Sequence, residues 1–241
     1  MLTILTGCHS DPRVAAYVDG VTITEAQVDS VLSEAQNASK NDVQANQGGN
    51  PSGTAVPTPT RSAVVAALTT KELLKRELAD KGLSPAQVDT QQLAQAFGLP
   101  AGAAYTDAVA YVQGGIVALA NSAGEGFHAS DADLRDVYNR GIASGLEGLG
   151  TYDQFKTQVV PQLSGFEQEI AARNELADRV THGGITVNPR YAPLDYTVVQ
   201  LTNQQTGQSF VAVPLRLAKG PAGNPVIDTP HSATPEATPA S

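Results

Sequence analysis

The only cysteine of the chain, Cys8, has the sequence context of a lipid attachment site. It follows Leu5, Thr6 and Gly7, and an aliphatic residue, two small residues and then cysteine are typical of the site that lipoprotein signal peptidase cleaves. We therefore expect residues 1–8 to be the end of a signal sequence. The mature protein would then work outside the cytoplasm, anchored by lipid to the outer face of the cell membrane.

The segment before this cysteine is shorter than a complete secretory signal. Met1 to Ile4 supply neither a basic region nor an apolar stretch of about 7–15 residues. We expect the translation start to lie upstream; the alternative is a free thiol near a frayed chain end. With a single cysteine, the chain forms no internal disulfide, CxxC pair or thiolate zinc cluster.

Other residue types that could do chemistry are scattered. No pair of histidines has the spacing of a metal site such as HExxH, so we expect no metal and no cofactor. The carboxylates of Asp131, Asp133 and Asp136 fall near a predicted helix start, where capping and the helix dipole explain them, although a general acid–base pair is an alternative. The histidines are His9, His128, His182 and His231.

Two further groupings have structural explanations. Gly114 and Gly115 fall inside a helical pattern, which indicates close packing rather than a phosphate loop. No nucleotide-binding fingerprint and no nucleophile elbow occurs, so we predict no catalytic residue and no enzyme. Acidic and basic residues at helical spacings indicate a solvated helix face: Glu167, Glu169, Glu175, Arg173 and Arg179.

Composition limits the partners. The chain has 241 residues, enough for a substantial core, but only 5% aromatic residues and no Trp. A net charge of -9 argues against nucleic acid, because phosphate binding needs clustered Lys and Arg. No run of about 18 apolar residues occurs, so membrane association must come through Cys8.

The N-terminal part begins with a predicted hairpin. Residues 14–18 and 21–23 flank Asp19-Gly20, a tight-turn signal. Thr24 and Gln27 then form a capping box that opens an amphipathic helix. Residues 37–60 are rich in Asn, Gln, Gly, Ser and Pro, and we expect a flexible insertion there.

The middle of the chain is predicted to be helical. Residues 64–78 form a helix that Gly82 caps, and Ser84 and Pro85 are expected to start a second helix that runs to Phe97. Three more helices are expected. The first covers residues 105–119, the second begins after the N-cap Ser130, with Phe155 and Val159 continuing its pattern, and the third covers about 165–180.

The last part changes to strand patterns. Short strands are predicted within residues 185–213, and residues 218–241 are expected to be disordered. The two ends of the chain should meet in one small sheet. The predicted fold is therefore mainly α, an irregular bundle of about five to seven helices with a small β-sheet, in one domain over residues 9–217.

Three segments together resemble the N-terminal part of the SurA-type periplasmic chaperones and the PrsA-type foldase lipoproteins. They are Val14–Val28, with its hairpin-to-helix entry, Ser130–Tyr138, and Arg173–Val180 leading to Val187-Asn-Pro-Arg-Tyr191. Full members insert a prolyl-isomerase domain of about a hundred residues, typical of one domain. Tyr138 to Gly165 leaves no room for it, so isomerase activity is not carried over.

The resemblance implies a helical chaperone that binds unfolded or extended segments of exported polypeptides, with no small-molecule substrate. The alternatives are an adaptor lipoprotein that docks one folded envelope partner and, less favoured, a prolyl isomerase. Aromatic and aliphatic side chains could contact a client, with ordinary core as the competing interpretation. They are Phe97, Tyr105, Val109, Val112, Ile116, Phe155 and Phe166.

Overall fold

The N-terminal hairpin forms as its sequence predicts. The computed structural model describes residues 11–45, 58–124, 126–146, 149–202 and 209–219. In it, β1 (Val14–Val18) pairs antiparallel with β2 (Val21–Thr24). Asp19 and Gly20 have φ angles of 47° and 84°. Both angles are positive, as a two-residue turn that matches the strand twist requires.

The first helix, α1 (Glu25–Ala45), begins with the predicted capping box. The Thr24 N–H donates to Gln27 Oε1, and the Gln27 N–H donates to Thr24 Oγ1 at 3.2 Å. The helix runs to Ala45, so the prediction of a flexible insertion from residue 37 is wrong over its first part. That stretch is polar but holds no Gly or Pro to interrupt a helix. Residues 46–57 of the insertion lie outside the described residues.

Two parallel helices form the centre of the bundle. These are α2 (Arg61–Lys81) and α4 (Ala104–Ala123). Lys71 of α2 lies over the Tyr111 ring of α4, and Leu74 of α2 fills the space beside Gly115 of α4. The contacts advance in the same direction along both helices, so the helices run parallel. Gly82, with a φ of 65°, caps α2 as predicted. The packing role of the central glycines is also confirmed, since a Cβ on Gly115 would lie 3.1 Å from the Leu74 side chain.

The next helix starts later than predicted. α3 (Thr90–Phe97) begins after Asp89, whose carboxylate accepts from the backbone N–H groups of Gln91 and Gln92. The residues before Asp89 are not helical, so the predicted start at Ser84 is wrong. The Ala86 N–H instead donates to the Gly114 carbonyl oxygen at 2.9 Å. This tertiary hydrogen bond holds the segment extended against α4.

The chain then forms α5 (Asp131–Ala143), a short segment of helical turns, and α7 (Phe166–His182). Ser130 caps α5 as predicted, because its Oγ accepts from the Asp133 N–H. Phe155, only 1% exposed, attaches the short segment to the core. That segment comprises α6 (Tyr152–Gln154), the π-helical turn η2 (Phe155–Val159) and the 3-10 turn η3 (Val160–Gln162).

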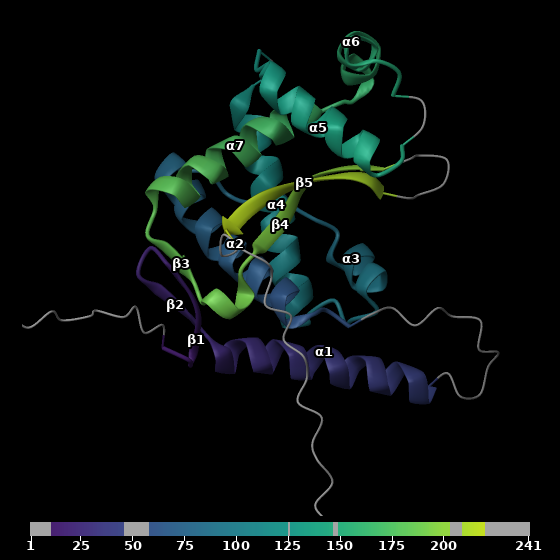
Figure 1. The fold of residues 1–241 in the computed structure, drawn as a ribbon. Coiled ribbons are helices and arrows are strands. Elements are labelled where there is room, and N and C mark those ends of the chain that lie inside the picture. The colour runs from purple at the N-terminus through teal and green to yellow at the C-terminus, as the bar shows by residue number, and fades with distance from the viewer. Residues whose placement is uncertain (1–10, 46–57, 125, 147–148, 203–208, 220–241) are drawn as a thin grey trace, which may run out of the picture.

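The two ends of the described chain meet in one small sheet, as predicted, but the last two strands form a second, separate sheet. β3 (Ile185–Val187) pairs with β1 and gives the order β2-β1-β3. The 3-10 turn η4 (Pro189–Tyr191) then redirects the chain, so that β4 (Leu194–Thr202) and β5 (Ser209–Ala218) form a separate antiparallel pair. This pair packs against α2, α5 and α7 (Figure 1). β5 therefore continues past residue 213, where the predicted strands ended.

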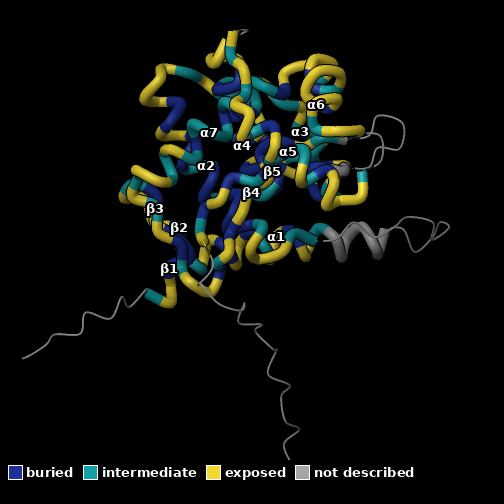
Figure 2. The backbone as a smooth tube through the Cα atoms, turned by 45° about the horizontal axis from the view of Figure 1, so that its top comes forward, coloured by how far each residue is buried: buried dark blue, intermediate teal, exposed yellow. Residues whose placement is uncertain are grey.

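The core lies among α2, α4 and α7 and beneath the β4–β5 pair (Figure 2). The predicted mainly-α class with small sheets is therefore confirmed. Among the described residues, no helix is long and apolar enough to cross a membrane. The centre of the core consists of large side chains with less than 2% exposure, including Leu73, Leu74, Leu119, Ile170 and Leu176.

Candidate functional site

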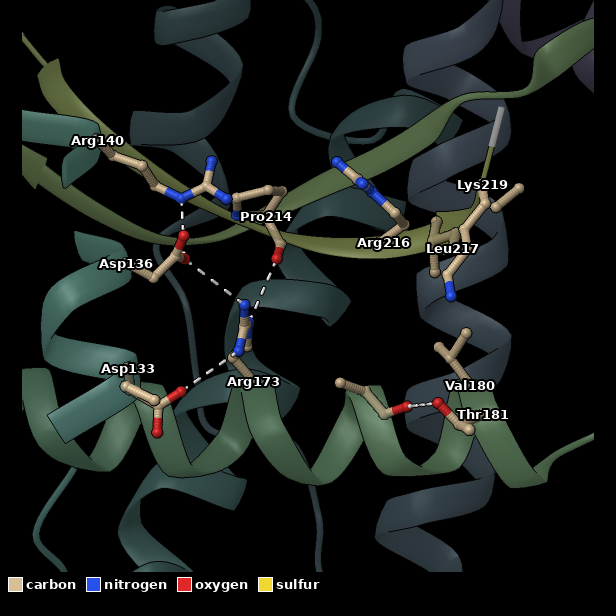
Figure 3. A pocket seen from close by; sticks show the side chains of 13 residues that line it. Asp133, Asp136, Arg140, Arg173, Val180, Thr181, Pro214, Arg216, Leu217 and Lys219 are labelled. Atoms are coloured by element: carbon tan, nitrogen blue, oxygen red, sulfur yellow. Dashed lines mark hydrogen bonds and ion pairs between the residues drawn. The ribbon is translucent and has the colours of Figure 1, made fainter. Parts of the chain in front are cut away.

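An open groove of about 560 Å³ lies between α5, α7 and the C-terminal part of β5 (Figure 3). Its size falls within the range of about 300–1,000 Å³ that is usual for ligand pockets. The groove combines a small apolar floor with charged walls. Its floor includes Ala177, Val180 and Leu217, and its charged lining consists of Asp133, Asp136, Arg140, Arg173, Arg216 and Lys219.

The alternation of β5 decides which of its residues reach the groove wall. Val213 and Leu215 are buried against the helices, whereas Pro214 is half-buried and Arg216 is exposed. Among the described residues β5 pairs only with β4, so its other edge runs along the groove. The strand therefore offers both side chains and backbone at this site.

Arg173 connects the three walls. Its guanidinium lies 3.6 Å from a carboxylate oxygen of Asp133 and 3.9 Å from one of Asp136, both on α5. Its Nε also donates to the Pro214 carbonyl oxygen at 3.4 Å. The side chain is only 22% exposed. Arg173 therefore holds α5, α7 and β5 at a fixed spacing (Figure 3).

The other charges of the groove differ in how they are paired. Arg140 donates to Asp136 at 2.9 Å, one helical turn away. Arg216 donates to Asp195 on β4 at 3.1 Å, and this hydrogen bond raises the pKa of Arg216. Lys219 is exposed and makes no ion pair with the described residues. The lining thus holds four cations and two carboxylates, in a chain of net charge -9.

The three carboxylates that the sequence singled out have different surroundings. Asp133 and Asp136 line the groove, where Arg173 lies beside both. Asp131 points elsewhere and accepts from Lys156, Tyr152 and Arg135. These bonds, the Lys156 contact most of all, lower the pKa of Asp131 to about 2. Each of the three carboxylates is therefore engaged by donors, and Asp131 and Asp133 also lie in the first turn of α5, as the capping and dipole interpretation expects.

The described histidines do not come together. His128 Nδ1 lies 3.3 Å from Glu167, at the start of α5. His182 Nδ1 lies 2.9 Å from the Asp178 carbonyl oxygen, at the end of α7. Over the described ranges, no group of three or more His, Cys, Asp or Glu residues could hold a metal ion. Cys8, His9 and His231 lie outside those ranges.

The prediction that the charged residues of α7 form a solvated face is wrong, because several of them pair with residues of other elements. Arg173 and Arg179 pair across to other elements, and Arg179 reaches Asp19, Glu77 and Asp80. Glu175 pairs with Lys81 on α2 at 2.7 Å. Glu169 is half-buried, and burial raises the pKa of its carboxyl group. Helical spacing alone could not reveal these ion pairs, because their partners lie on other elements, from 37 residues (Asp136 to Arg173) to 160 residues (Asp19 to Arg179) away in the sequence.

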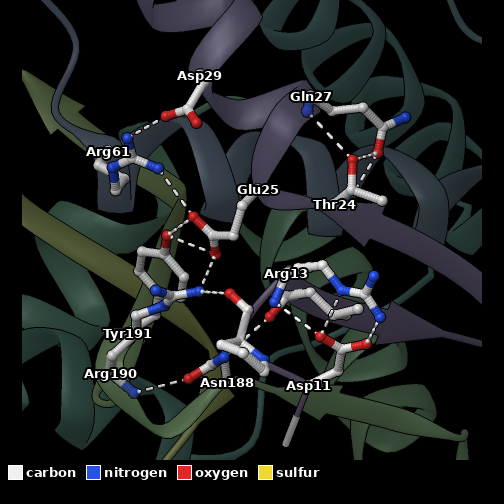
Figure 4. A network of polar contacts seen from close by, with 12 residues as sticks. Asp11, Arg13, Thr24, Glu25, Gln27, Asp29, Arg61, Asn188, Arg190 and Tyr191 are labelled. Carbon is white, nitrogen blue, oxygen red and sulfur yellow. Dashed lines mark hydrogen bonds and ion pairs between the residues drawn. The ribbon is translucent and has the colours of Figure 1, made fainter.

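A second polar network joins the two ends of the described chain (Figure 4). The Glu25 carboxylate accepts from the Tyr191 hydroxyl at 2.7 Å, from Arg61 at 2.8 Å and from Arg190 at 2.7 Å. Asn188 donates to the Val14 carbonyl oxygen at 2.9 Å. The Val-Asn-Pro-Arg-Tyr segment therefore fastens β3 and η4 to α1 and α2, which is a structural role.

The aromatic and aliphatic side chains considered for client contacts belong mostly to the core. Phe97 and Tyr105 are half-buried and pack edge to face, with ring centroids 5.4 Å apart. Within the described residues, the exposed large hydrophobic side chains are few: Tyr17, Val21, Val117 and Ile142. Those that form core are Val109, Val112, Ile116, Phe155 and Phe166, each less than 9% exposed.

Comparison of the chain with protein-family models, with curated proteins and with solved structures finds no match.

Proposed function

We propose that the protein is a non-enzymatic chaperone-like binding protein of the cell envelope, which holds extended or unfolded segments of exported polypeptides. The observation that carries this proposal is the open groove between α5, α7 and β5. It combines apolar floor residues, charged side chains and the edge of a strand. An extended polypeptide presents the complementary groups, which are apolar and charged side chains and unpaired backbone.

The charges of the groove suit binding better than proton transfer. Arg173 lies beside both Asp133 and Asp136, and Arg140 donates to Asp136, so both carboxylates are already engaged by cations. A general acid or base needs instead a carboxyl group that can exchange a proton with a substrate. Arg173 also joins α7 to α5 through these ion pairs, so two walls of the groove are connected.

We also propose that Cys8 carries lipid and anchors the protein to the outer face of the cell membrane. The support is the Leu5-Thr6-Gly7-Cys8 sequence. The intact mass of membrane-extracted protein tests it, because cleavage before Cys8 and added acyl chains both change the mass. An unmodified mass that still includes residues 1–7 would contradict the proposal.

Suppression of client aggregation tests the binding function. The full chain, mixed at equal molar amounts with a chemically unfolded client, should slow the rise of light scattering. A Thr181→Trp variant should lose most of this effect, because Thr181 is exposed and lines the groove. Thr157→Trp is a matched control, since Thr157 is also exposed on a helical segment and also donates to the carbonyl four residues earlier.

The outcomes separate the competing functions. No suppression by the unchanged chain would contradict the chaperone proposal. Equal suppression by both tryptophan variants would show that clients bind outside the groove. Capture of one folded envelope protein, without any effect on unfolded clients, would favour the adaptor alternative.

A further inference from the structure

The outer edge of β5 has backbone groups that point into the groove. The Pro214 carbonyl oxygen accepts from Arg173 on α7, so this carbonyl points away from β4. Along a regular strand, residues two apart direct their N–H and C=O groups to the same side. The pairing of Pro214, Leu215 and Arg216 with β4 is regular, one residue to one. The N–H and C=O of Arg216 therefore also point toward the groove.

Proline at this position is consistent with an open edge. Pro214 has no N–H, and proline is tolerated in strands where the missing donor would face away from the paired strand. Its carbonyl is already bonded by Arg173, which leaves Arg216 as the next outward-facing residue. The register shifts after Arg216, where Leu217 has no partner on β4, so the regular edge runs from Pro214 to Arg216. At about 3.3 Å per residue it is about 7 Å long, and it offers the N–H and C=O of Arg216 to an added strand.

The side chains around this edge favour an acidic segment. Four cations and two carboxylates line the groove. Arg216 is exposed but already pairs with Asp195 on β4, whereas Lys219 is exposed and makes no ion pair within the described residues, so Lys219 is the cation that an acidic side chain can engage. On the other side of the edge lie the apolar Ala177 and Val180 of α7. An added strand would therefore place alternate side chains against cations and against apolar residues.

We propose that an extended segment with alternating acidic and apolar residues binds here as an additional strand on β5, with its backbone bonded to Arg216. This inference rests on the proposed function and specifies its substrate class. It commits to strand addition, in which backbone hydrogen bonds supply affinity and alternate side chains supply selectivity. The alternation also fixes the register, because a slip of one residue would direct acidic side chains to the apolar floor.

Alternately N-methylated peptides test the backbone part of this proposal without changing the protein. The probe is a fluorescent eight-residue peptide of alternating Val and Asp, whose binding to the full chain is followed by fluorescence anisotropy. Methylating one alternate set of amides should weaken binding at least about tenfold, the effect of about two lost hydrogen bonds. Methylating the other set, which faces away from β5, should change affinity little. The two methylated peptides control for each other in composition.

Charge variants test the side-chain part. Lys219→Glu should weaken binding of the acidic probe by about threefold, the effect of one exposed charge, and should improve binding of a Val-Lys peptide. Lys75→Glu is the charge-matched control, because Lys75 is exposed and does not line the groove. The Arg216 amide should exchange with solvent more slowly only when the acidic probe is present.

The outcomes distinguish this inference from the proposed function. Equal affinity of both methylated peptides, or unchanged exchange at Arg216, would overturn strand addition. Client protection by the groove could then still hold through side-chain contacts alone. Failure of every peptide to bind, with client protection intact, would also overturn strand addition. Failure of both peptide binding and client protection would overturn both proposals.

Discussion

Replacing Gly114 by alanine tests how α4 is packed at the centre of the fold. A Cβ at this position would lie closer than 3.0 Å to the Ala86 carbonyl oxygen and 3.3 Å from the Pro85 Cβ. Backbone atoms cannot rotate away as a flexible side chain can. The extended segment before α3 must therefore move, and the bond from the Ala86 N–H to Gly114 is weakened.

The expected loss can be estimated from separate contributions. Overpacking costs about 1–3 kcal/mol, and a lost backbone hydrogen bond costs about 1 kcal/mol. The better helix propensity of alanine returns about 1 kcal/mol. Gly114→Ala should therefore lower the free energy of unfolding by about 2 kcal/mol, equivalent to a fall of about 4–8 °C in Tm for a chain of this size.

Urea unfolding followed by circular dichroism measures this change, and the neighbouring glycine supplies the control. A Cβ on Gly115 would meet only the Leu74 side chain, at 3.1 Å, and that side chain can adjust. Gly115→Ala should therefore change stability by no more than about 0.5 kcal/mol, since propensity offsets the tighter packing. Equal stability of the two variants would refute the packing described for α4.

Three further predictions concern other parts of the fold. Burial raises the pKa of Glu77, and the neighbouring Glu175 is the next cause. Between pH 4.5 and this raised pKa the native state binds more protons than the unfolded state, so stability falls as the pH rises through that range. Glu77→Gln should reduce this slope, as measured by urea unfolding at several pH values. The pKa of Asp131 is lowered to about 2, chiefly by Lys156. Its contribution to the free energy of unfolding is therefore present above pH 3.8 and is lost as the pH falls toward 2. Asp131→Asn should reduce the loss of stability over this pH range, and an unchanged loss would contradict the assignment. Thr24→Ala removes the capping hydroxyl of α1 and should cost about 1 kcal/mol, whereas Thr24→Ser should restore stability.

Local signals in the sequence were enough to predict several elements. The turn at Asp19-Gly20, the capping box at Thr24, the cap at Ser130 and the stop at Gly82 each depend on residues a few positions apart. Their hydrogen bonds form within one turn, so tertiary structure had little to change.

Signals that compete with tertiary contacts failed. Ser84 and Pro85 have the pattern of a helix start, but the bond from Ala86 to Gly114 holds the chain extended. The turn at Pro189–Tyr191 likewise separates β4 from the terminal sheet. A local sequence pattern reveals neither feature, because the hydrogen-bond partner of Ala86 and the strand partners of β3 and β4 are set by the tertiary fold.

The groove could be predicted only in fragments. The sequence singled out Asp133 and Asp136, which do line it, but not Arg216 or Lys219. The lining comes from three segments between residues 132 and 219, which only the packing of α5, α7 and β5 brings together. The free edge of β5 depends on strand pairing, which the alternating pattern does not specify.

Site-specific photocrosslinking tests most directly whether the groove holds clients. A photoreactive amino acid is placed at Ala132, which is exposed and lines the groove, or at Ala96, which is also exposed, lies on α3 and does not line the groove. Each variant is mixed with an unfolded exported client and irradiated. The groove account predicts crosslinks to client from position 132 and few from position 96. Equal crosslinking from both positions, or crosslinking from position 96 alone, would contradict it.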